Sequence, residues 1–135
     1  AGTQGAHVIL TDLQDVLTET TQANLRANMQ ALRPSGDAFA GTVSLQALAW
    51  GDGPDRLERA PPFDYVLAAD VVYRPELFAP LKWTLLQLAG PGTQVLLAYT
   101  RRRSQEEWFF SSLMEDFTCS AVWRGCTGRT DEGKR

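Results

Sequence analysis

The feature that most constrains this chain is the alternation of short apolar runs with longer amphipathic stretches. The runs have the length of β-strands, and most are continuous rather than alternating, as in strands buried on both faces of a parallel sheet. They are predicted at His7–Leu10, Thr42–Leu48, Phe63–Asp70 and Gln94–Tyr99, with a weaker fifth at Phe117–Trp123. Strands that alternate with helices in this way predict an α/β sandwich with a mostly parallel sheet.

Three amphipathic stretches predict the intervening helices, at Gln14–Leu32, Glu76–Leu88 and Ser104–Asp116. Apolar residues recur every three or four positions, so each helix has one face suited to a core. In the first helix these are Leu17, Thr21, Leu25, Met29 and Leu32; in the second, Leu77, Leu81, Leu85 and Leu88; in the third, Phe109 and Leu113, with Phe117 beyond its end. We also expect Pro75 at an early helical position, where proline is tolerated.

Composition excludes several classes of protein. The 135 residues suffice for one domain, which we expect over residues 1–124, with a flexible tail at 125–135. The net charge of −3 does not indicate a nucleic-acid groove. The apolar runs are too short for a membrane span. One histidine and two cysteines, Cys119 and Cys126, do not have metal-ligand spacing, and we expect no metal and free thiols in a reducing compartment.

Candidate functional residues stand where the first two strands end, because ligands of parallel sheets gather beyond the carboxyl ends of the strands. Asp12 follows the first run. Its carboxylate could accept hydrogen bonds from both hydroxyls of a ribose, or it could be an exposed turn or helix-capping residue. Trp50 follows the second run, and its ring could pack on an adenine or be an ordinary core or rim aromatic.

The third strand leads into Asp70-Val71-Val72-Tyr73. Asp70 could orient an amine nucleophile or stand beside a cationic cofactor, and Tyr73 could shape a channel; the alternative is a capping aspartate followed by a packed tyrosine. Arg101-Arg102-Arg103 follows the fourth strand and could contact an acidic substrate surface or form a solvated loop. Gly51-Asp52-Gly53 begins like G-x-G-x-x-G, but Arg56 occupies the third glycine position, so it does not predict a phosphate loop.

With these segments in order, the chain resembles the seven-β-strand protein-lysine methyltransferases (methyltransferase family 16), nearest the branch of the valosin-containing-protein lysine methyltransferase. The matching segments are Gly5–Leu13, Leu48–Gly51, Phe63–Tyr73 and Val95–Arg103, the last with its aromatic helix through Phe110. The resemblance implies a Rossmann-like class I methyltransferase sandwich. It also implies S-adenosylmethionine (SAM) as cofactor and transfer of its methyl group to a lysine side chain of a protein substrate.

The resemblance assigns roles to six residues. Asp12 matches the residue that binds the SAM ribose, Leu13 lies beside the adenine, Trp50 is at the adenosine, Ala69 is close to SAM, and Asp70 and Tyr73 are catalytic at the entrance for the lysine. The same resemblance leads us to expect a monomer in the cytoplasm and also in the nucleus, acting on a protein and on neither nucleic acid nor membrane.

Two parts of the family pattern are missing: the first strand with its glycine loop, of which Ala1-Gly2-Thr3 resembles a remnant, and the last strand. We therefore expect this chain alone to be poorly stable and to bind SAM weakly or not at all. An alternative is a catalytically incomplete fragment or isoform that acts only as a protein-binding module. A nicotinamide-binding oxidoreductase is a further alternative, which Trp50 and Asp70–Tyr73 disfavour.

Overall fold

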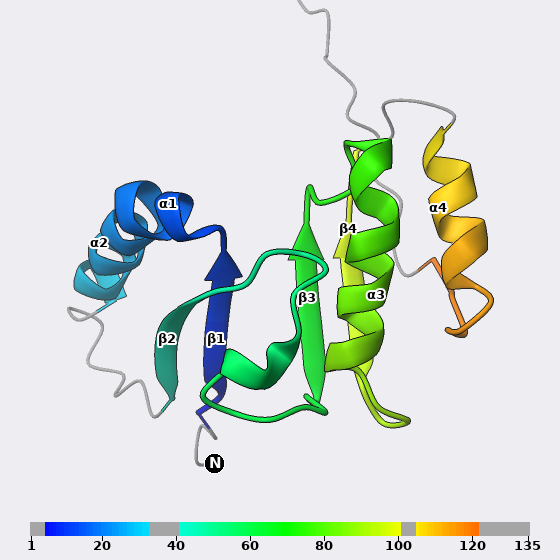
Figure 1. The fold of residues 1–135 in the computed structure, drawn as a ribbon. Helices are drawn as coiled ribbons and strands as arrows, with labels where there is room; N and C mark the ends of the chain where they lie inside the picture. The colour runs from blue at the N-terminus through cyan, green and yellow to red at the C-terminus, as the bar shows by residue number, and fades with distance from the viewer. Residues whose placement is uncertain (1–4, 33–40, 101–104, 122–135) are drawn as a thin grey trace, which may run out of the picture. The chain divides into compact units, whose positions relative to one another are not determined.

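The strands of this protein pair in parallel, in two separate pairs (Figure 1). The computed structural model describes residues 5–32, 41–100 and 105–121. Strand β1 (His7–Asp12) pairs with β2 (Thr42–Ala47), and β3 (Tyr65–Ala69) pairs with β4 (Gln94–Ala98). Register places Val8 opposite Val43 and Leu67 opposite Leu96. The predicted α/β class with parallel strands is confirmed.

The expected sheet lacks its first strand, and in the described residues the strands form two separate pairs rather than one continuous sheet. Within them, β1 has β2 as its only strand partner, and β3 has only β4. The reason is that no ladder of backbone hydrogen bonds joins one described pair to the other, and such a ladder is what makes strands one sheet. Each pair therefore has an edge that no described strand covers.

The first predicted helix is present but contains three segments: α1 (Gln14–Val16), the π-helical turn η1 (Leu17–Thr21) and α2 (Gln22–Leu32). At the π turn, the Gln22 backbone N–H donates a hydrogen bond to the Leu17 carbonyl five residues back. The predicted apolar face is confirmed where side chains are described, because Leu17 is buried and Thr21, Leu25 and Met29 are half-buried.

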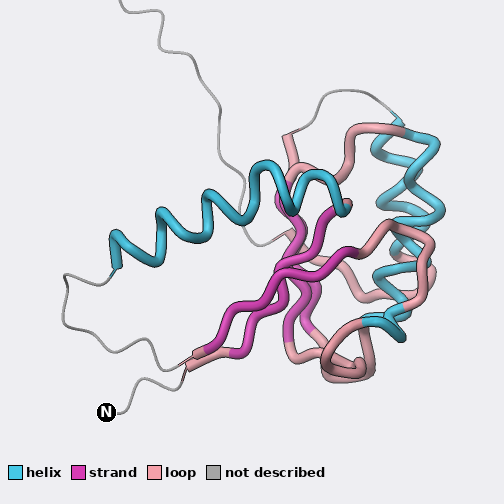
Figure 2. Tube along the Cα trace, turned by 60° about the vertical axis from the view of Figure 1, so that its left-hand side comes forward, coloured by secondary structure: helices cyan, strands magenta, loops and turns pink. Residues whose placement is uncertain are grey.

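Helix α3 (Phe78–Leu88) supplies most of the tightly buried side chains of the first compact unit, residues 1–100. The helix begins at Phe78 rather than at the predicted Glu76, because Pro75 opens a 3-10 turn, η4 (Pro75–Leu77), ahead of it. Its buried side chains are Phe78, Leu81, Thr84 and Leu85. Figures 1 and 2 both show α3 running alongside the β3–β4 pair.

The two faces of the β3–β4 pair differ in exposure. One set of alternating side chains is half-buried and the other set is exposed, with Leu67 72% and Tyr65 60% accessible. The continuous apolar runs predicted coverage of both faces. That prediction is wrong for the described residues, because the side chains on one face are half-buried and those on the other face are exposed.

The second compact unit, residues 101–135, contains helix α4 (Gln105–Leu113). Its predicted seam is confirmed, since Phe109 and Leu113 are buried and Phe117 is half-buried. The weak strand predicted over Phe117–Trp123 is wrong as far as Ala121, because the Phe117 N–H donates to the Leu113 carbonyl and continues the turn that ends α4. The cap at Ser104, residues 122–123 and the tail at 125–135 lie outside the described residues.

Candidate functional site

The candidate site is built at the ends of three strands. Strands β1 and β2 are parallel, and in Figure 1 β3 points the same way, so their carboxyl ends lie on one side of the first compact unit. Asp12 is the last residue of β1, Trp50 comes three residues after β2, and Asp70 directly follows β3. The Leu48 N–H donates to the Asp12 carbonyl at 3.0 Å, which joins the end of β1 directly to the segment that leads to Trp50.

Asp12 is the last residue of β1, and its side chain is exposed. Its Oδ1 atom accepts a hydrogen bond from the Leu13 N–H at 2.8 Å, while Oδ2 has no bond to the part of the chain that the structure describes. The N-cap of α1 is Leu13, without a side-chain hydrogen bond, so Asp12 does not cap this helix in the usual way. Leu13 presents an apolar side chain, 52% exposed, beside this carboxylate.

Trp50 lies in a tight turn whose geometry requires the glycine after it. The Asp52 N–H donates to the Ala49 carbonyl at 3.0 Å, and Gly51 has a φ angle of +97°. This combination matches a type II turn, in which the third residue needs a positive φ and is usually glycine. Trp50 is the second residue of that turn and is half-buried. The type II turn therefore explains why a glycine follows Trp50 in the sequence.

The turn is also fixed to helix α3. The Gly51 N–H donates to Oγ1 of Thr84 at 2.9 Å, and Thr84 is only 4% exposed. Sequence reasoning missed Thr84. The available signal was a threonine within an otherwise apolar helix stripe, but nothing local links it to a glycine 33 residues away.

Asp70 follows β3 directly and has an unusual backbone. Its φ angle is 55°, in the left-handed region that side chains other than glycine seldom adopt, although aspartate tolerates it better than most. Its N–H donates to the Ala98 carbonyl at 2.9 Å, so β4 holds this conformation in place. The side chain is exposed. Strained residues of this kind cluster at functional sites, which makes Asp70 a stronger candidate than its sequence pattern alone.

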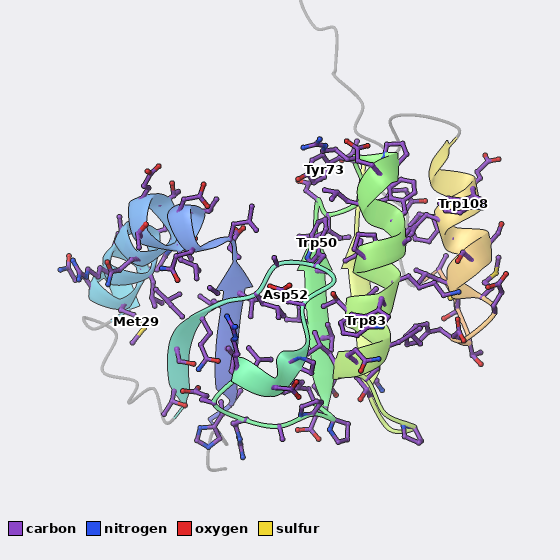
Figure 3. All side chains as sticks on the ribbon, in the orientation of Figure 1. Met29, Trp50, Asp52, Tyr73, Trp83 and Trp108 are labelled. Carbon is purple, nitrogen blue, oxygen red and sulfur yellow. The ribbon has the colours of Figure 1, made fainter. Side chains whose placement is uncertain are left out.

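The residues around Asp70 form an anchored segment with exposed ends. Ala69, the last residue of β3, is exposed, whereas Val72 is buried at 3%. Tyr73 is 45% exposed, which disfavours the alternative of a packed core tyrosine. Figure 3 shows Trp50 and Tyr73 toward the edge at which β3 ends. Val72 thus holds the backbone while Asp70 and Tyr73 face solvent.

An exposed ion pair directly follows this segment. Nη2 of Arg74 lies 2.7 Å from Oε1 of Glu76. The pKa of Glu76 is lowered, first by a hydrogen bond from its own backbone N–H and then by the Arg74 side chain. Both side chains are exposed, so this pair adjusts the local charge without forming a buried site.

Other candidates do not join the site. His7 begins β1, at the amino end of the strand, and its Nδ1 lies 2.7 Å from Oγ1 of Thr42. Cys119 is an exposed thiol. Cys126, Arg101–Arg103 and Ala1–Thr3 lie outside the described residues. In the described ranges, histidine, cysteine and acidic side chains form no group of three suited to a metal, and no helix is long and apolar enough to span a bilayer.

Comparison with known proteins shows which family this sequence resembles. METTL21A of Danio rerio, named as a protein N-lysine methyltransferase, is 34% identical over 118 residues, covering 87% of this chain and 50% of the relative. EEF1A lysine methyltransferase 3 of Xenopus tropicalis is 31% identical over 119 residues, covering 87% and 48%. The chain thus spans about half the length of these relatives.

The valosin-containing-protein branch stays a prediction, since these relatives carry other names. A family model described as lysine methyltransferase matches residues 1–116, which include all three strand ends of the candidate site. Since that match extends over most of the sequence, the chain belongs to the lysine methyltransferase family.

Proposed function

We propose that this chain is the SAM-binding and lysine-binding part of a protein-lysine methyltransferase. The observation that carries the proposal is the position of Asp12, Trp50 and Asp70 at or just beyond the carboxyl ends of three strands that point the same way. The printed names of the relatives support the reaction class. Because the chain covers about half of them, the activity of the whole protein belongs to this proposal.

The described residues fit the nucleoside half of SAM. Oδ2 of Asp12 is available to accept a hydrogen bond from a ribose hydroxyl. Leu13 offers exposed apolar surface and Trp50 a partly exposed ring, both suited to the faces of an adenine. Ala69 is exposed and small, so it leaves room beside the strand end. Asp70 adds a carboxylate suited to a neighbouring positive charge.

Bound SAM supplies an electrophilic methyl group on a sulfonium. The contribution of Asp70 is to accept a hydrogen bond from a neutral lysine amine and so fix the direction of its lone pair. Asp70 does not generate the neutral amine, because a nearby negative charge favours the ammonium form of a group whose ordinary pKa is about 10.4. Removal of water from the amine has the opposite effect and lowers its pKa. The exposed tyrosine at position 73 bounds the entrance and contributes a hydroxyl to it.

The proposed partner is a protein that presents a lysine, and the proposed setting is the cytoplasm, with the nucleus as a second compartment. We propose that the protein is a monomer. We also propose that it binds neither nucleic acid nor a membrane. The net charge of −3 supports the first exclusion, because a nucleic-acid groove needs clustered positive charge.

The test is methyl transfer by the complete protein. It is incubated with SAM labelled in the methyl group and an extract from cells that lack the enzyme, and acid hydrolysates of the labelled protein are analysed for methyl-lysine. Label in lysine is expected. Asp70→Gly is the matched variant, because glycine also accepts a positive φ and the side-chain acceptor is removed. It should reduce kcat by about a hundredfold or more at unchanged folding. Absence of label would overturn the proposal, and an unchanged kcat would remove Asp70 from the mechanism.

A further inference from the structure

Thr84 is the one buried polar side chain in the described part of the chain, and it faces the turn that carries Trp50. Its neighbours in the α3 stripe, Leu81 and Leu85, are each 2% exposed. A hydroxyl in such surroundings is costly unless it is hydrogen-bonded. Oγ1 of Thr84 accepts the Gly51 N–H at 2.9 Å, so the buried oxygen is matched to one backbone donor of the turn.

That donor belongs to the peptide group between Trp50 and Gly51. Type I and type II turns differ in the direction in which this central peptide points. The bond to Thr84 holds the Gly51 N–H toward α3, and the φ of +97° at Gly51 fits the type II arrangement. Thr84 therefore constrains the backbone from which the Trp50 side chain projects.

A second contact from the same helix supports this. A Cβ atom added to Gly51 would lie 3.3 Å from Cβ of Pro80, one helical turn before Thr84. Positions four apart lie on the same face of a helix. Pro80 and Thr84 thus form one surface of α3 on which Gly51 rests closely, and Trp50 is carried by a turn with little freedom to move.

We propose that Thr84 is a positioning residue for the SAM nucleoside, acting through the Trp50–Gly51 turn. The inference rests on the proposed function, because it assigns the Trp50 ring to the adenosine. Thr84 has no contact with the reacting atoms in this scheme. Its loss should therefore weaken SAM binding and leave the chemical step nearly unchanged.

The test compares Thr84→Val, which keeps the shape and removes the acceptor, with Thr84→Ser, which keeps the acceptor. In the complete protein, Thr84→Val should raise the KM for SAM by about tenfold, with kcat and the KM for the protein substrate within about twofold. Thr84→Ser should have the same KM for SAM as the wild type. If Thr84→Val yields too little folded protein, Thr84→Cys replaces it, and its weakly accepting sulfur should give an intermediate KM.

The outcomes separate this inference from the proposed function. A wild-type protein that neither binds nor uses SAM overturns the proposed function and the inference with it. A wild-type protein that uses SAM, together with a Thr84→Val variant of lowered Tm but unchanged KM for SAM, overturns only the inference and leaves Thr84 a purely structural residue. The inference is also overturned if Thr84→Ser raises the KM for SAM as much as Thr84→Val does, because the hydroxyl acceptor would then not matter.

Discussion

Helix α3 and the exposed face of the β3–β4 pair both carry leucine side chains, but these side chains differ in exposure. In α3, Phe78, Leu81 and Leu85 are each 2% exposed. On the sheet, Leu67 is 72% and Leu96 45% exposed, although the two are paired across neighbouring strands. Burial here depends on whether another element covers a residue, as well as on its side chain.

The comparison shows why apolar runs are ambiguous. The apolar run at Phe63–Asp70 predicts a strand, and strand β3 is present at Tyr65–Ala69. Alternate side chains point to opposite faces, so one covering element can hide only half of such a strand. The open face, defined here by Tyr65, Leu67 and Leu96, therefore marks where stabilising contacts are absent from the described residues.

The largest expected effect concerns the 135-residue chain taken alone. Each described strand pair has an uncovered edge, and two-stranded sheets are marginal in water. We expect a circular dichroism melt without a cooperative transition, corresponding to loss of most of the roughly 5–15 kcal/mol typical of a folded domain. The Danio rerio relative, of which the matched region is half the length, serves as a control with a cooperative melt. A sharp melting transition for the chain alone would contradict the claim that the uncovered strand pairs leave it poorly stable.

A smaller effect is expected from a single truncation in the covered region. In the complete protein, Leu85→Ala should lower the free energy of unfolding by about 2–5 kcal/mol, because it leaves a cavity in a packed site. The matched control is Leu86→Ala on the same helix, where the side chain is 36% exposed and the loss should stay under about 1 kcal/mol. Urea denaturation measures both. Equal losses of unfolding free energy in the two variants would show that the difference in exposure does not affect stability.

Substitution on the open face should change surface properties more than stability. Leu67→Thr with Leu96→Thr keeps residues suited to strands but removes exposed apolar area. In the isolated chain, binding of a hydrophobic fluorescent dye should fall and soluble yield should rise, because less apolar surface is exposed. If dye binding does not change, the open face is not the apolar surface that the dye detects.

The smallest effect is expected at Glu76. Folding lowers its pKa, through its own backbone N–H and then Arg74, so the ionised form stabilises the fold. This contribution is complete above the unfolded pKa and is lost as pH falls through the folded pKa. In the complete protein, Glu76→Gln should lower Tm slightly at neutral pH, and the difference should vanish in acid. A difference that grows on acidification would contradict this assignment.

Local pattern was enough to predict most elements of the fold. The stripes containing Leu81 and Phe109 identified α3 and α4, because helical periodicity is a property of neighbouring residues. The strand predicted from Phe117 failed because a strand needs a partner, which no local pattern supplies. The start of α3 was misplaced for a local reason, the 3-10 turn that Pro75 opens.

The candidate site was partly predictable for a topological reason. Asp12, Trp50 and Asp70 were identified because ligands gather beyond the carboxyl ends of parallel strands, and the structure places each at or just beyond the end of its strand. The positive φ of Asp70 and the bond from Gly51 to Thr84 could not be predicted, since each depends on contacts with distant segments. The roles of these residues stay predictions.

The most direct test of the account is a calorimetric titration of SAM into the complete protein and its Asp12→Ala variant. The central claim is that the strand-end carboxylate of Asp12 holds the ribose of SAM. We predict saturable binding to the wild type and affinity weakened by about tenfold or more in Asp12→Ala, because a hydrogen bond to a charged acceptor is lost. Equal affinity of the two proteins, or no binding to either, would contradict the claim.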